Sequence, residues 1–166
     1  PHPNTHIIEK NIKLFVNAGA VGMFAQGDLY NDSVCFSHVR NWVISKLLWN
    51  PSLDGNELMR KFMKGYYGKS AGTMKRIMNV YSESVLRANY RLTCYNRTAP
   101  YYTAADYKKA FALFNKALSE ADSQEIRDRI DVQRKGLQLA LLLSNRSVRK
   151  EVLASGITGI DDINKW

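Results

Sequence analysis

The strongest constraint on the fold is a change in hydrophobic period near residue 20. Residues 4–18 carry apolar side chains three and four positions apart, which is typical of an amphipathic helix, and Gly19 is placed to end it. The short apolar run from Ala20 to Gln26 then follows without that spacing and stops at Gly27, as in a buried strand. Beyond it every apolar pattern has the helical period. The sequence therefore predicts a mostly α-helical chain with one strand.

A lone strand cannot pair its own backbone groups, because sheet hydrogen bonds join neighbouring strands. A parallel strand flanked by helices is the repeating unit of barrels and doubly wound sheets. We therefore interpret residues 1–50 as the last helix–strand–helix segment of a (β/α)8 barrel and residues 51–166 as a carboxy-terminal helical domain. Two alternatives stay open: the run is a buried helical turn, or it pairs with the same strand of a second copy.

The helical part is expected to be a bundle of about five helices. A helix capped by Asp32 or Ser33 ends before Pro51, which lacks a backbone donor. The five that follow are expected near residues 54–65 or 54–68, 70–91, 104–121, 123–143 and 147–153. Their expected caps are Asp54 or Asn56, then Thr103, Ser123 and Ser147, and the glycines Gly65, Gly68, Gly156 and Gly159 are expected at helix ends.

Composition excludes several classes of protein. No stretch approaches the roughly twenty continuous apolar residues that a membrane span needs. The net charge of +9 is spread along the chain among acidic residues, without a recognition helix or zinc-finger pattern, which argues against nucleic-acid binding. Three scattered histidines and two cysteines, Cys35 and Cys94, form neither a metal-ligand pattern nor a disulfide framework. We expect no metal and no cofactor, and the redox state of the cysteines stays open.

Three runs of sequence carry a family resemblance. Residues 11–27 read NIKLFVNAGAVGMFAQG, residues 47–54 read LLWNPSLD, and residues 62–68 read FMKGYYG. Together they resemble the DUF4838 family, whose members are large, mostly Bacteroidetes proteins with a glycoside-hydrolase-like barrel and a distant similarity to α-glucuronidases. The turn also has a purely local explanation, in which Trp49 closes an apolar helix face and Asn50 is held extended before proline.

The resemblance implies that the chain is the carboxy-terminal part of a secreted, periplasmic or cell-surface protein that processes or binds polysaccharide. Its export signal and most of its active site would lie upstream, so this chain alone is not expected to be an enzyme. The implied partners are the rest of the parent barrel and a carbohydrate. Whether the parent is catalytically active is left open.

Candidate binding residues lie just after the predicted strand, because barrel enzymes place their active sites at the carboxyl ends of the strands. There, Gln26 could hydrogen-bond sugar hydroxyls, Asp28 could accept from them, and Tyr30 could stack on a sugar ring. The alternative is an ordinary turn. No catalytic residue is assigned, since glycosidase chemistry needs two carboxylates a defined distance apart and Asp28 has no identifiable partner.

A rival interpretation treats the chain as a helical protein-interaction module without enzymatic activity. Residues 104–143 alternate small and large apolar side chains as helix-hairpin repeats do, although no thirty-four-residue period extends along the chain. The many tyrosines could build a sugar platform, but their helical spacing favours packing. Association between copies of the chain also stays open.

Overall fold

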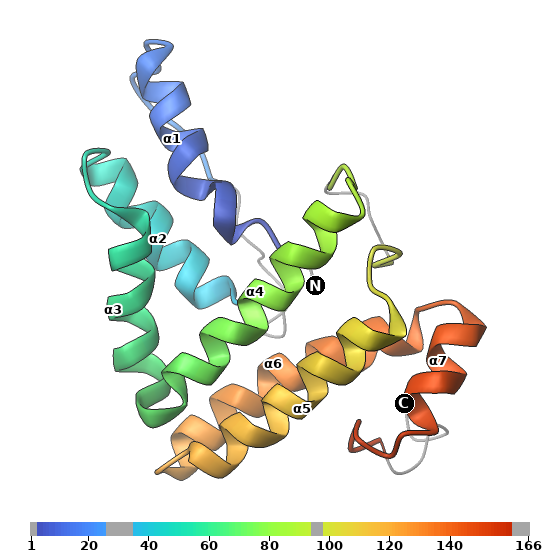
Figure 1. The fold of residues 1–166 in the computed structure, drawn as a ribbon. Helices are drawn as coiled ribbons and strands as arrows, with labels where there is room; N and C mark the ends of the chain where they lie inside the picture. Colours follow the sequence, from blue (N-terminus) through green and yellow to red (C-terminus); the bar gives the residue numbers. More distant parts are fainter. Residues whose placement is uncertain (1–2, 26–34, 94–97, 161–166) are drawn as a thin grey trace.

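The computed structural model describes residues 3–25, 35–93 and 98–160 of the chain (Figure 1). Within these ranges the regular structure is entirely helical. The elements are η1 (Thr5–Ile7), α1 (Ile8–Asn17), α2 (Ser37–Trp49), α3 (Gly55–Tyr67), η2 (Gly68–Ser70), α4 (Ala71–Arg87), α5 (Ala104–Glu120), α6 (Gln124–Leu142) and α7 (Arg146–Leu153). The expected bundle of five helices after residue 51 therefore corresponds to α3 through α7.

Most successive helices pack against each other, and α4 makes its most extensive contact with α5. Figure 1 shows α1, α2 and α3 on one side of the molecule and α5, α6 and α7 on the other, with α4 between them. A single cluster of buried side chains runs from Ile8 in α1 to Val152 in α7. Residues on both sides of position 50 contribute to this core. The expected domain boundary at residue 50 stays a prediction.

Local chemistry explains where most helices begin. Asp54 caps α3 by accepting hydrogen bonds from the N–H groups of Asn56 (2.8 Å) and Glu57 (3.1 Å). Thr103 and Asp106 form a reciprocal capping box at the start of α5, and Ser123 caps α6. These caps confirm the expected ones.

The cap of α7 is a correction, because Asn145 and not Ser147 accepts from the N–H of Val148, at 2.9 Å. Both residues match the preferred cap chemistry, so the sequence alone did not distinguish them.

Left-handed residues follow the ends of α1 and α4 and reverse the chain. Gly19 (φ 83°) ends α1 as expected, and the N–H of Ala20 donates to the carbonyl of Phe15 at 3.0 Å. Asn89 (φ 47°) ends α4 in the same way, with the N–H of Tyr90 donating to Val85 at 3.1 Å. This second turn stops α4 at Arg87, four residues before the expected end.

Three other expectations are wrong for the described residues. Ala20–Ala25 form no strand and no helical turn, and their side chains are exposed instead of buried. Gly65 lies inside α3, which ends at Tyr67 and is followed by Gly68. The helix before Pro51 begins only at Ser37; its expected caps, Asp32 and Ser33, lie outside the described residues.

Candidate functional site

The three sugar-binding candidates, Gln26, Asp28 and Tyr30, lie in residues 26–34, outside the part of the chain that the structure describes. Their proposed roles stay predictions. The described residues that come before this segment, 20–25, are the end of the run that we expected to be a strand. Together with α1 and the end of α2 they line a surface hollow that carries exposed apolar side chains.

Exposed apolar side chains gather on this surface. Val21 is 106% exposed and Phe24 is 88% exposed, in a chain whose other apolar side chains are mostly buried. The carboxyl-terminal half of α1 adds Leu14, Phe15 and Val16, each at least 45% exposed. Isolated exposed apolar residues are normal, but a contiguous group of them marks an interaction surface.

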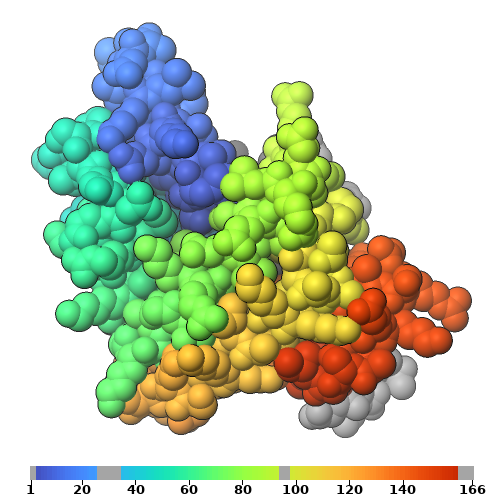
Figure 2. All heavy atoms as spheres, viewed as in Figure 1, coloured from blue at the N-terminus to red at the C-terminus, as the bar shows by residue number. Residues whose placement is uncertain are grey.

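A shallow hollow of about 150 Å³ lies within this surface. It is lined by residues of α1, of the segment after it, and of the end of α2: Ile12, Phe15, Val16, Ala20, Val21, Gly22, Met23, Leu48 and Pro51. We call these nine residues the apolar groove. In Figure 2, α1 stands at the edge of the molecule, joined to the body near its amino-terminal end.

The local structure explains why the groove is open. In α1, Ile8 and Ile12 face the core and are buried, whereas Phe15 and Val16 lie one turn farther along and have no core to meet. The left-handed Gly19 then turns the chain back so that residues 20–23 line the groove together with α1. Apolar side chains of α1 are thus left in contact with water.

The end of α2 departs from the local explanation given for the Trp-Asn-Pro turn. Asn50 has an extended backbone (φ −142°, ψ 96°), as expected for a residue before proline. Its side chain accepts a hydrogen bond from the N–H of Ser52 at 3.0 Å. Trp49, however, is 92% exposed and packs on no apolar face of this chain. The expectation that Trp49 closes an apolar helix face is therefore wrong for the described residues.

A second pocket, of about 320 Å³, lies between α2, α3 and α6 and is lined mostly by residues of polar or charged type. Its Arg129 guanidinium covers the ring of Tyr66 at 4.1 Å, donates to the Tyr66 carbonyl at 2.9 Å and pairs with Glu125. Asp128 accepts from Gln124 at 2.7 Å. These groups are engaged with one another, and the described residues contain no cluster of His, Cys, Asp or Glu that could hold a metal ion.

The tyrosines act as packing residues. Tyr67, Tyr81, Tyr101, Tyr102 and Tyr107 are buried. Tyr107 donates to the Ala140 carbonyl at 3.1 Å, and burial raises the pKa of Tyr81 and Tyr102 well above the ordinary value. They form part of the core and offer no ring face to a sugar. Tyr95 lies outside the described residues.

No helix within the described ranges is long and apolar enough to cross a membrane.

Comparison with known proteins finds a family match over the first part of the chain. Residues 1–79 match DUF4838, which is described as a domain of unknown function. Over these residues the chain is similar to the DUF4838 family. The DUF4838 segment contains the whole apolar groove, and it ends inside α4, at a residue whose neighbours Met78 and Val80 are buried. No curated protein and no solved structure matches the chain significantly.

Proposed function

We propose that this chain is the carboxy-terminal helical part of a secreted glycoside-hydrolase-like protein that processes or binds polysaccharide. In this proposal the apolar groove is the surface on which the rest of the parent barrel packs. The helices α3 to α7 buttress that barrel and complete one wall of its cleft, and Gln26, Asp28 and Tyr30 are the proposed sugar-binding residues.

The observation that carries the proposal is the exposed apolar segment 20–25 beside α1. Each Val or Phe side chain that becomes fully buried contributes about 1.5–3 kcal/mol, so this segment has a strong tendency to find a partner surface. A neighbouring strand would also pair the backbone groups of the segment. The resemblance to DUF4838 barrels supports the choice of partner, since in sequence residues 11–27 look like the final barrel strand of that family with its preceding helix.

The decisive experiment compares this chain with a longer one that includes the residues encoded upstream. The double substitution Val21→Lys, Phe24→Lys is expected to lower the unfolding free energy of the longer chain by at least about 3 kcal/mol, because it removes two buried apolar contacts. In the chain described here the same change is expected to cost less than about 0.5 kcal/mol, since both side chains are exposed. Chemical denaturation followed by circular dichroism measures both values.

The matched control is Leu86→Lys, Leu143→Lys, which alters two exposed leucines far from the groove in the sequence. It is expected to be nearly neutral in both chains. Equal effects of Val21→Lys, Phe24→Lys in the two chains would contradict the proposal and favour the interaction module. If the chain described here forms a dimer that Val21→Lys, Phe24→Lys dissociates, the groove is instead covered by a second copy.

The polysaccharide part of the proposal has its own test. Binding of the longer chain to a glycan array is expected to weaken when Gln26 and Asp28 are changed to alanine, and to weaken further with Tyr30→Ala. Unchanged binding would remove residues 26–34 from the sugar site.

A further inference from the structure

The charge of the chain is unevenly distributed in the region of α3 and α4. From Leu58 to Ser82 the sequence contains six lysines and arginines and neither aspartate nor glutamate. The six are Arg60, Lys61, Lys64, Lys69, Lys75 and Arg76. This stretch covers most of α3, all of η2 and two thirds of α4. The folded chain therefore carries a local excess of positive charge here.

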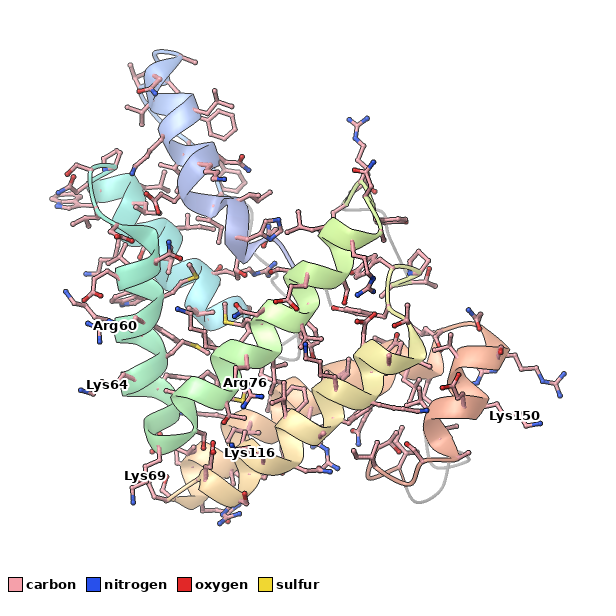
Figure 3. The ribbon with its side chains drawn as sticks, in the orientation of Figure 1. Arg60, Lys64, Lys69, Arg76, Lys116 and Lys150 are labelled. Atoms are coloured by element: carbon pink, nitrogen blue, oxygen red, sulfur yellow. The ribbon has the colours of Figure 1, made fainter. Side chains whose placement is uncertain are left out.

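The fold brings part of this charge onto one face with a basic residue of α5. Figure 3 shows Arg60 and Lys64 on α3, Lys69 below them, Arg76 on α4 and Lys116 on α5. The helices α4 and α5 are held in register by the Ser70 hydroxyl, which donates to the Ala117 carbonyl at 2.8 Å. We call the five residues labelled on these three helices and on η2 the basic face.

Part of this charge is not neutralised, although Arg60 forms an exposed pair with Glu57 at 2.6 Å. Lys64 and Arg76 are exposed and form no ion pair among the described residues. Lys69 lies 3.8 Å from Asp122 and Lys116 lies 3.6 Å from Glu120, in pairs whose lysines are more than half exposed. Exposed ion pairs of this kind contribute little, so these lysines can exchange their partner for an external anion.

The basic face remains accessible when the apolar groove is covered. The groove reaches Pro51, just before α3 begins at Gly55, whereas Lys64 lies nine residues farther along that helix. At 1.5 Å per residue this separates Lys64 from the start of α3 by about 13 Å, and Lys69 lies beyond it. A partner on the groove and a ligand on the basic face can therefore bind together.

We propose that the basic face binds an anionic polysaccharide, one whose sugars carry carboxylate or sulfate groups. Regularly spaced anions along a polymer match several separate cations better than a single small anion does, and their attraction to the face adds over the contacts. The choice of polysaccharide rests on the proposed function.

The aromatic residues of this region argue against single-stranded nucleic acid. Proteins that bind it without sequence preference usually stack bases on exposed rings. Here Phe62 and Tyr66 stack on each other with ring centres 4.9 Å apart, and Arg129 covers the Tyr66 ring. These rings are therefore not free to stack on bases. The experiment still compares nucleic acid with polysaccharide as a ligand of the basic face.

The experiment measures binding of the whole chain to polygalacturonate and to heparin, with dextran as the uncharged control. Binding to at least one of the two charged polymers, and none to dextran, is expected, with an affinity that falls steeply between about 50 and 200 mM salt. The variant Lys64→Ala, Lys69→Ala, Arg76→Ala is expected to bind about tenfold more weakly, since it removes three cationic contacts.

The matched control is Lys135→Ala, Arg146→Ala, Lys150→Ala. It removes two lysines and one arginine, all exposed residues of α6 and α7, so the net charge falls equally. Figure 3 shows Lys150 on α7, away from the basic face. This control is expected to change the affinity less than threefold.

Three results would overturn the inference: no binding to either charged polymer, equal weakening by the two triple variants, or tighter binding to duplex DNA or to vesicles of equal parts phosphatidylglycerol and phosphatidylcholine. Failure of the proposed function is separable, because it is tested by the stability of the longer chain. If Val21→Lys, Phe24→Lys had equal effects in the two chains while the basic face bound polygalacturonate or heparin specifically, only the barrel proposal would be overturned.

Discussion

Asp106 shows how a single ionised side chain can stabilise two parts of this molecule. Its carboxylate accepts from the N–H of Thr103 at 2.8 Å, which completes the cap of α5, and pairs with Arg87 at the end of α4. Burial alone would raise the pKa of this carboxyl group. The hydrogen bonds from Arg87 and Thr103 outweigh that effect and hold the pKa below its ordinary value of 3.8.

A pH dependence follows from this shift. A carboxyl group whose pKa is lowered by folding stabilises the folded state above its unfolded pKa, and the contribution disappears as the pH falls through the folded pKa. We expect Asp106→Asn to lower the unfolding free energy by about 1 kcal/mol at pH 7, because it weakens charge-assisted hydrogen bonds. The deficit should shrink as the pH falls below 3.8.

Denaturant unfolding at several pH values measures this difference. The control is Glu151→Gln, which breaks the exposed pair with Lys108 and should change stability by less than about 0.5 kcal/mol at every pH. A deficit for Asp106→Asn that stays constant down to pH 2 would show that the charge contributes nothing.

At the scale of the elements, α2 differs from the other helices in how it begins. Phe36, its first flanking residue, is left-handed (φ 53°), and no side chain near it in sequence caps the helix. Its buried N–H donates instead to the side chain of Gln133 on α6, at 2.8 Å, across 97 positions of the chain. The start of α2 is therefore set by a tertiary contact.

This contact gives the second prediction. Gln133→Ala leaves the buried Phe36 N–H without its acceptor, which should cost about 1–3 kcal/mol of unfolding free energy. Gln124→Ala is the control on the same helix, since its side chain is exposed and bonds only to Asp128 four residues away. Thermal and denaturant unfolding of both variants measures the cost, and equal effects would contradict the role given to Gln133.

Sequence patterns predicted the helix ends that neighbouring residues determine and misplaced those that depend on distant residues or on an unusual backbone conformation. Asp54, Thr103 and Ser123 were identified as caps because a short polar side chain beside an apolar stripe is a sufficient local signal. The start of α2 was placed too early because its acceptor, Gln133, is remote in sequence. The end of α4 was placed too late because Asn89 adopts a left-handed turn that asparagine only sometimes takes.

At the scale of the whole molecule, the DUF4838 match ends in the middle of a structural element. Residue 79 lies inside α4, whose buried side chains, including Met74, Ile77 and Tyr81, pack in one core with α5. The family boundary is therefore not a folding boundary. A chain cut at residue 79 loses the partner of α4 and exposes its apolar face.

We accordingly expect residues 1–79 alone to lack a cooperative unfolding transition and a full helical circular dichroism signal, because the remaining core is too small to offset the conformational entropy. A chain of residues 1–160 should keep both properties, since it contains all of the helices described here. A sigmoidal denaturation curve for residues 1–79 would contradict this expectation and make the DUF4838 segment an independent domain.

The sequence by itself determined that the chain is helical after residue 51 and where most of its helices begin. It also showed a resemblance to DUF4838 in the motifs between residues 11 and 68. Periodicity, caps and motifs are local properties, so a sequence can carry them. Only the tertiary structure decided that Val21, Phe24 and Trp49 are exposed and that the basic residues of α3 and α4 share a face with Lys116. Whether a side chain is exposed depends on which parts of the folded chain pack together. An apolar sequence pattern shows only that a segment is suited to burial. Residues 20–25 keep the composition of a buried strand, and within the described chain nothing covers them.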